Sequence, residues 1–166
     1  MKTILIGPSG SGKTTIAKEL EKKGFKVAKS MTTRPKRNNE NEDSYFFVDE
    51  TAFEKEELIL KTDFNGYQYG LPVKEIERAD VFILEPSGAK ELRRFCPEAK
   101  IIALAISKSE ARKRMVLRGD TAIAIRKRME NDEKVFTGYL EEADYIVPVE
   151  MPIKDILSIL SVYLSL

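Results

Sequence analysis

The 166-residue chain contains no histidine and a single cysteine. Without histidine, the protein has neither an imidazole base nor an imidazole ligand for a metal. Cys96 alone cannot form an internal disulfide, and no zinc-type cysteine spacing exists. The formal net charge is +1, so no global attraction to nucleic acid or to an acidic membrane surface is expected. An anion site must therefore come from a local cluster of residues.

Long apolar runs are also missing. The first apolar run is only one strand long before Gly7, which is too short for a signal peptide. The apolar tail at 152–166 is interrupted by Lys154 and Asp155 and is too short to span a bilayer. With 166 residues and 42% apolar content, we expect one cytoplasmic domain that is not bound to membrane or nucleic acid.

Short apolar runs alternate with helical patterns along most of the chain. Strands are expected at 2–6, 25–30, 81–85, 100–106 and 145–149. Helices are expected at 12–24, 53–59, 73–79, 107–119, 121–143 and 152–166. This alternation predicts an α/β fold in which helices cover both faces of a parallel sheet. Residues from about 30 to 71 are polar, turn-rich and aromatic, so we interpret them as an insert on that core.

The sequence GPSGSGKTT, from Gly7 to Thr15, follows the first apolar run and matches the pattern G-x-x-x-x-G-K-[ST]. Glycines let successive amide groups point toward phosphate oxygens, and the following helix N-terminus favours negative charge. Lys13 would reach the β- and γ-phosphates, and the Thr14 hydroxyl would hold Mg²⁺. The alternative is a turn that only links strand to helix. The predicted triphosphate site comprises Gly7, Ser9, Gly10, Ser11, Gly12, Lys13, Thr14 and Thr15.

Two further groups of residues suggest anion or metal binding. Glu85 ends the apolar run 81–85, at the edge of a parallel sheet where ligands usually bind, although a solvated carboxylate would also suit that place. Arg34 and Arg37 flank a proline ahead of Tyr45, and two guanidinium groups with a phenol can hold a second phosphate. The alternative for this second group is a basic turn balanced by the acidic residues between 40 and 43.

Taken together, these segments resemble guanylate kinases. The motifs are GPSGSGKTT, S-x-T-T-R-P-x-R at 30–37, D-x-Y-x-F at 43–47, N-G-Y-x-Y-G at 65–70, and the later R-G at 118–119 and K-R-M at 127–129. The resemblance spans about nine tenths of the chain. It implies a P-loop kinase whose core (1–29, 73–111 and 131–166) carries a monophosphate-binding insert at 30–72 and a helical lid at 112–130.

The resemblance also implies roles for individual residues. ATP and Mg²⁺ would be the cofactors, with Thr14 and Glu85 near the metal. Lys13, Arg114, Arg118 and Arg128 would act on the transferring phosphoryl group. The acceptor would contact Ser30, Arg34, Arg37, Tyr45, Leu60, Tyr69, Leu71 and Glu85. The partners would be small nucleotides, and the protein would be a monomer or a homodimer.

The chain departs from the family at two positions that read guanine. Guanylate kinases carry a carboxylate ten residues before the glycine of N-x-Y-G and a hydroxyl just after it, and here these positions are Leu60 and Leu71. An unpaired buried polar group costs roughly 1–3 kcal/mol, so the preference for guanine should fall. Either Thr62, Asp63 or Gln68 reads the base instead, or the acceptor is not guanine.

Three functions therefore stay open. The first is a kinase that phosphorylates GMP, dGMP or another nucleoside monophosphate. The second is a kinase of a sugar phosphate such as ribose 1,5-bisphosphate, because ribose bisphosphate kinases resemble guanylate kinases. The third is a non-catalytic interaction module, which the intact phosphate loop argues against. The insert and the lid are expected to close on the substrates and exclude water.

Overall fold

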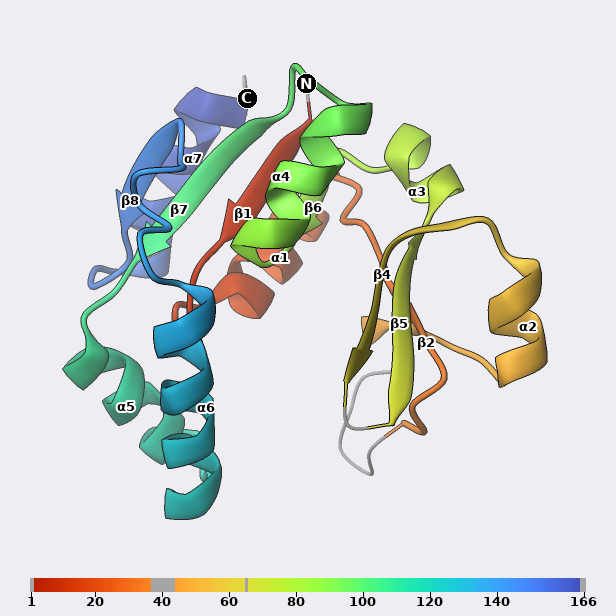
Figure 1. Ribbon diagram of the computed structural model, residues 1–166. Coiled ribbons are helices and arrows are strands. Elements are labelled where there is room, and N and C mark those ends of the chain that lie inside the picture. Colours follow the sequence, from red (N-terminus) through yellow and green to blue (C-terminus); the bar gives the residue numbers. More distant parts are fainter. Residues whose placement is uncertain (1, 37–43, 65, 165–166) are drawn as a thin grey trace.

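A computed structural model describes residues 2–36, 44–64 and 66–164 of the chain. Its first sheet has four parallel strands in the order β6-β1-β7-β8. These strands are β1 (Thr3–Ile6), β6 (Val81–Ile83), β7 (Lys100–Ala105) and β8 (Tyr145–Pro148). Helices lie on both faces of this sheet (Figure 1). The predicted α/β architecture with a parallel core is confirmed.

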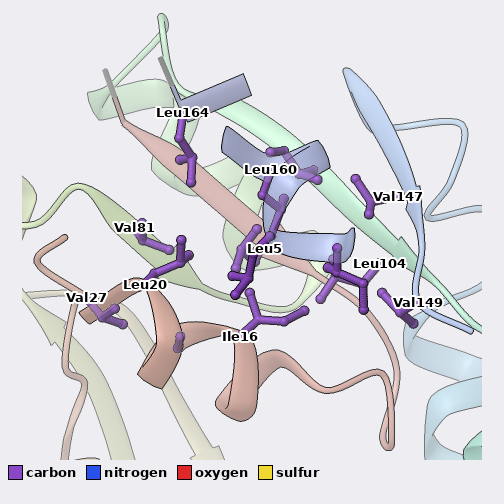
Figure 2. Close-up of a cluster of buried hydrophobic side chains, with 14 residues drawn as sticks. Leu5, Ile16, Leu20, Val27, Val81, Leu104, Val147, Val149, Leu160 and Leu164 are labelled. Atoms are coloured by element: carbon purple, nitrogen blue, oxygen red, sulfur yellow. The ribbon is translucent and has the colours of Figure 1, made fainter. Parts of the chain in front are cut away.

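One face of the first sheet packs against α1 (Lys13–Lys22) and α7 (Ile153–Leu164). Side chains alternate between the two faces of a strand, so Leu5 points to this face and its neighbours Ile4 and Ile6 point to the other. Figure 2 shows Leu5 near the centre of the cluster, close to Leu20 of α1 and Leu160 of α7. Burying each such leucine contributes about 1.5–3 kcal/mol, which fixes α1 and hence the loop that precedes it.

The opposite face packs against α4 (Pro86–Phe95), which contributes Ala89 and Leu92 to the second apolar cluster. Every residue of β1 is buried, because helices cover it from both sides. The strand therefore consists of apolar residues and one threonine rather than alternating polar and apolar residues.

A second sheet is built from residues between 31 and 72, in the order β3-β2-β5-β4. Its strands are β2 (Met31–Thr32), β3 (Phe46–Phe47), β4 (Leu58–Phe64) and β5 (Tyr67–Pro72). Helix α2 (Glu50–Lys55) begins at Asp49, whose carboxylate accepts the Ala52 amide at 2.7 Å. Helix α3 (Val73–Arg78) leads the chain back to the first sheet.

Two helices, α5 (Lys108–Leu117) and α6 (Ala122–Val135), form a hairpin after β7. Ser107 and Thr121 cap them, each accepting an amide of the first turn at 3.2 Å. Figure 1 shows this hairpin and the second sheet extending beyond the same end of the first sheet, on opposite sides. Among the described residues, no helix combines the length and the apolarity that crossing a bilayer requires.

Three local predictions were wrong. The strand expected at 25–30 is a single bridge between Val27 and Val81, since the segment also contains Lys26 and Lys29 and only Val27 is buried in it. The helix expected at 121–143 ends at Val135, and Gly138 has a φ of 70° in the turns that follow. The helix expected at 53–59 spans Glu50–Lys55 instead, and Leu58 and Ile59 already belong to strand β4.

Candidate active site

The loop between β1 and α1 has a shape that depends on glycine. Gly10 and Gly12 have φ angles of 79° and 87°, in the left-handed region that other residues rarely adopt. A Cβ on Gly10 would lie 2.8 Å from the carbonyl oxygen of Ala111, so the loop packs directly against the backbone of α5. The glycine at position 10 is therefore required by the packing of the loop against α5, in addition to any role in binding a ligand.

The N-terminus of α1 has no side-chain cap. Gly12 is its N-cap residue, and the first turn contains no acidic side chain. The first amides of a helix lack partners within the helix and favour an anion at that end. This arrangement suits a phosphate chain, the ligand that the sequence motif predicts.

The Lys13 ammonium folds back over the loop. Its Nζ donates to the carbonyl of Gly7, to that of Pro8 at 3.0 Å, and to the Ser11 Oγ at 3.4 Å. Burial lowers the pKa of Lys13 to about 8, and the nearby carboxylates of Asp132 and Glu85 oppose that shift. The lysine therefore sits among neutral carbonyls, in a place where a phosphate would restore a favourable environment for its charge.

The C-terminal half of α6 also touches the loop. The Ser9 amide donates to Asp132 Oδ2 at 2.9 Å, and the Lys13 Nζ lies 5.9 Å from the centroid of the Phe136 ring. Neither Asp132 nor Phe136 was predicted as a site residue. Asp132 lies in the run ENDEK, where nothing in the sequence distinguishes it from its charged neighbours.

The three predicted lid arginines divide into two groups. Arg114 lies behind the loop, where its Nη1 donates to the Gly10 carbonyl at 3.3 Å and its Nη2 to the Val149 carbonyl at 2.5 Å. Arg118 and Arg128 instead face Asp120, whose carboxylate accepts the Arg118 Nε at 3.0 Å and lies 3.9 Å from the Arg128 Nε. The hydrogen bond from Arg118 keeps the pKa of Asp120 below its usual range.

A second candidate site lies on the second sheet, around Arg34. The guanidinium is 5.7 Å from the Tyr45 ring centroid and 5.6 Å from that of Phe47, and only 9% of the residue is exposed. Tyr69 meets Tyr45 edge to face at 6.1 Å. The structure thus brings Arg34, Tyr45 and Tyr69 together and adds Phe47. Arg37, predicted for the same role, lies outside the described residues.

The remaining predicted acceptor residues have other neighbours. The Ser30 carbonyl accepts the Phe46 amide at 2.9 Å, which joins the start of β2 to β3. Leu71 is 1% exposed and belongs to the second apolar cluster, and the half-buried Leu60 packs against the same cluster. Leu60 has a φ of 53°, next to an irregularity in the pairing of β4 with β5. Both leucines thus fill space between the two sheets.

The predicted metal ligands fit Mg²⁺ bound together with phosphate. Thr14 and Glu85 are exposed, and Glu85 is the N-cap residue of α4 with no capping hydrogen bond from its side chain. No group of three or more acidic or cysteine side chains within the described part of the chain forms a metal site. A hydroxyl and one carboxylate leave most positions of an octahedral ion to phosphate and water oxygens, as Mg²⁺ prefers.

Comparison with known proteins identifies the family of this chain. The family model for guanylate kinase matches residues 1–165. The guanylate kinase of Bacillus cereus is 36% identical over 160 residues, an alignment that covers 87% of this chain and 78% of that enzyme. The guanylate kinase of Thermobifida fusca is 36% identical over 116 residues, but the alignment covers 62% of this chain and only 59% of that enzyme.

A solved structure shares the fold. The crystal structure of guanylate kinase from Anaplasma phagocytophilum superimposes with a TM-score of 0.70, and the match covers 99% of this chain and 84% of that one. Its sequence identity is 22%, so this likeness concerns the fold alone. On the strength of the family model and the sequence relatives, the chain belongs to the guanylate kinase family, a family of phosphotransferases.

Proposed function

We propose that this protein is an ATP- and Mg²⁺-dependent kinase that transfers the γ-phosphate of ATP to the phosphate of a nucleoside monophosphate. Two separate anion sites support this proposal: the phosphate loop with Lys13, and the aromatic surroundings of Arg34 on the second sheet. A protein that only hydrolysed ATP would need the first site alone. The second site would bind the phosphate group of the acceptor.

The chemistry needs little covalent help from the protein. The acceptor phosphate is already anionic and nucleophilic, so positioning and charge neutralisation supply most of the rate. Lys13 would bind the β- and γ-phosphates. Arg118 and Arg128 would leave Asp120 and bind the transferring phosphoryl group. Bound Mg²⁺, near Thr14 and Glu85, would neutralise phosphate charge. Residues 30–72 would bind the acceptor, and 112–130 would form the lid.

GMP or dGMP remains the first candidate acceptor because of the family. The leucines at 60 and 71 offer no hydrogen bond to a base, and both pack against the core cluster. Reading of guanine would then rest on Thr62, Asp63 or Gln68, which belong to β4 and β5. The same two leucines favour a second candidate, a sugar phosphate that carries no base.

An assay of ADP release across a panel of acceptors tests the proposal. The panel comprises GMP, dGMP, AMP, CMP, UMP, dTMP and ribose 1,5-bisphosphate. We expect turnover with at least one nucleotide and weaker discrimination between bases than two intact guanine-reading groups would give. Turnover with the bisphosphate alone would overturn the nucleotide version, and no turnover with any acceptor would favour a binding module.

Substitutions at Arg34 test the acceptor site itself. Arg34→Lys keeps the charge but removes the planar guanidinium group that lies near the rings of Tyr45 and Phe47. The KM for the active acceptor should rise about tenfold or more, the loss expected for a charge-assisted hydrogen bond, while the KM for ATP stays unchanged. Arg94→Lys, the same substitution at an exposed position on α4, is the matched control. Equal effects on both substrates would contradict the assignment.

A further inference from the structure

An acidic side chain accepts a hydrogen bond from a main-chain amide of the phosphate loop. Asp132 of α6 accepts the Ser9 amide at 2.9 Å, across 123 positions of sequence. Loop amides of this kind bind phosphate oxygens in nucleotide-binding proteins. A carboxylate is also an anionic acceptor, so Asp132 offers this amide the same kind of partner that a phosphate would.

The charge of Asp132 also acts on the loop lysine. Among the carboxylates whose charge acts on Lys13, that of Asp132 has the largest effect, ahead of Glu85. The lysine is largely buried against loop carbonyls, and a nearby negative charge partly offsets the cost of burying its ammonium group. Asp132 therefore provides, in this structure, part of the compensation that a triphosphate would provide.

The same face of α6 carries a predicted lid residue. Arg128, Asp132 and Phe136 are spaced four residues apart and so follow one another along one side of the helix. In this structure Asp132 and Phe136 lie against the loop, and Arg128 lies near Asp120. Because Arg128 and Asp132 belong to the same helix, a shift of α6 that removes Asp132 from Ser9 would also move Arg128.

We propose that the Asp132 carboxylate competes with nucleotide phosphate for the phosphate loop, and that it leaves the Ser9 amide when a triphosphate binds. Two anions at one amide and one ammonium repel each other, so the carboxylate and the phosphate do not share the loop. Asp132 thereby weakens the affinity for ATP and couples ATP binding to a movement of α6. This inference rests on the proposed binding of ATP at the loop.

Calorimetric titration of ATP, with and without Mg²⁺, tests the competition. The variants are Asp132→Ala, which removes the carboxylate, and Asp132→Asn, which removes its charge but keeps a carbonyl acceptor. Glu133→Ala is the matched control, because this neighbouring carboxylate pairs with Lys108 and not with the loop. Melting temperatures of all four proteins verify that they are folded.

We expect Asp132→Ala to bind ATP about tenfold more tightly than the unmodified protein. ATP would then no longer have to displace a charged acceptor from the Ser9 amide. Asp132→Asn should bind more tightly by a smaller factor, and Glu133→Ala should match the unmodified protein. A purely structural role for Asp132 would instead weaken ATP binding. Unchanged or weaker binding by Asp132→Ala, in a protein whose unmodified form binds ATP, would overturn this inference alone. Failure of the unmodified protein to bind ATP would overturn the proposed function as well.

Discussion

At the scale of single residues, the protonation of Lys13 affects both the stability of the fold and the affinity for ATP. Its pKa is lowered to about 8 because it is buried against loop carbonyls. A bound triphosphate would surround the ammonium with negative oxygens and raise that pKa. Binding above pH 8 therefore requires the uptake of a proton.

We expect the affinity for ATP to fall about tenfold for each pH unit above this value, because one proton is taken up for each nucleotide bound. Titration calorimetry between pH 7 and 9.5, in buffers of different ionisation enthalpy, measures both the affinity and the protons taken up. Lys13→Arg stays charged throughout this range and should show a flat profile, whatever its absolute affinity. A flat profile in the unmodified protein would contradict the buried position of Lys13.

The same group affects stability with the opposite dependence on pH. In the unfolded chain Lys13 titrates near 10.5, so between about 8 and 10.5 the unfolded state binds more protons than the folded state. Its contribution to the free energy of unfolding therefore rises with pH across this window, in the protein without nucleotide. Deprotonation thus favours the fold and weakens nucleotide binding.

The residues of the site differ in how far the sequence could predict them. Gly7 to Thr15 are consecutive, so their spacing along the chain largely fixes their arrangement in space. Arg34, Tyr45 and Tyr69 were found through motifs, and the structure places them together. Asp132 and Phe136 reach the loop only through the packing of α6. No local sequence pattern predicts their contacts with Ser9 and Lys13.

At the scale of elements, the contact between the phosphate loop and α5 limits which residues can replace Gly10. Gly10→Ala combines a left-handed φ of 79° with a Cβ that would lie 2.8 Å from the Ala111 carbonyl oxygen. Gly138→Ala is the matched control: its φ is 70°, but nothing lies within 4 Å of the added atom.

Both substitutions should cost about 1 kcal/mol for the strained backbone, and Gly10→Ala should cost about 1–3 kcal/mol more because the loop must move off α5. Chemical denaturation measures this difference, and ATP titration should show weaker binding for Gly10→Ala alone. Equal losses of stability and of ATP affinity in the two variants would mean that α5 does not support the loop.

The elements that the sequence mispredicted share a physical cause. No helix was predicted at 86–95, because Pro86, Ser87 and Gly88 indicate the end of a strand; yet proline also suits the first turn of a helix, and α4 begins there. Val27 sits in a β-rich segment, but only one residue of that segment pairs with the sheet. Local composition indicates where an element can begin, whereas packing against the sheet determines whether and how far it extends.

At the scale of the whole molecule, the two predicted phosphate sites lie on separate parts of the fold. The phosphate loop belongs to the first sheet and Arg34 to the second, and the α5–α6 hairpin extends beyond the same end of the core as the second sheet (Figure 1). Arg118 and Arg128 face Asp120 rather than the loop. For the proposed transfer between two bound phosphates, we expect these parts to approach one another.

We expect the radius of gyration to fall when an analogue that joins adenosine and the acceptor nucleoside through a phosphate chain fills both sites. ATP alone should produce a smaller decrease, because it binds the loop and displaces α6 but does not bind the second sheet. Small-angle X-ray scattering measures the change, with Lys13→Ala as a control that should not respond at the same ligand concentration. Scattering profiles that coincide with and without the bound analogue would mean that the catalytic geometry already exists in the open protein, and that Arg118 and Arg128 do not take part in transfer.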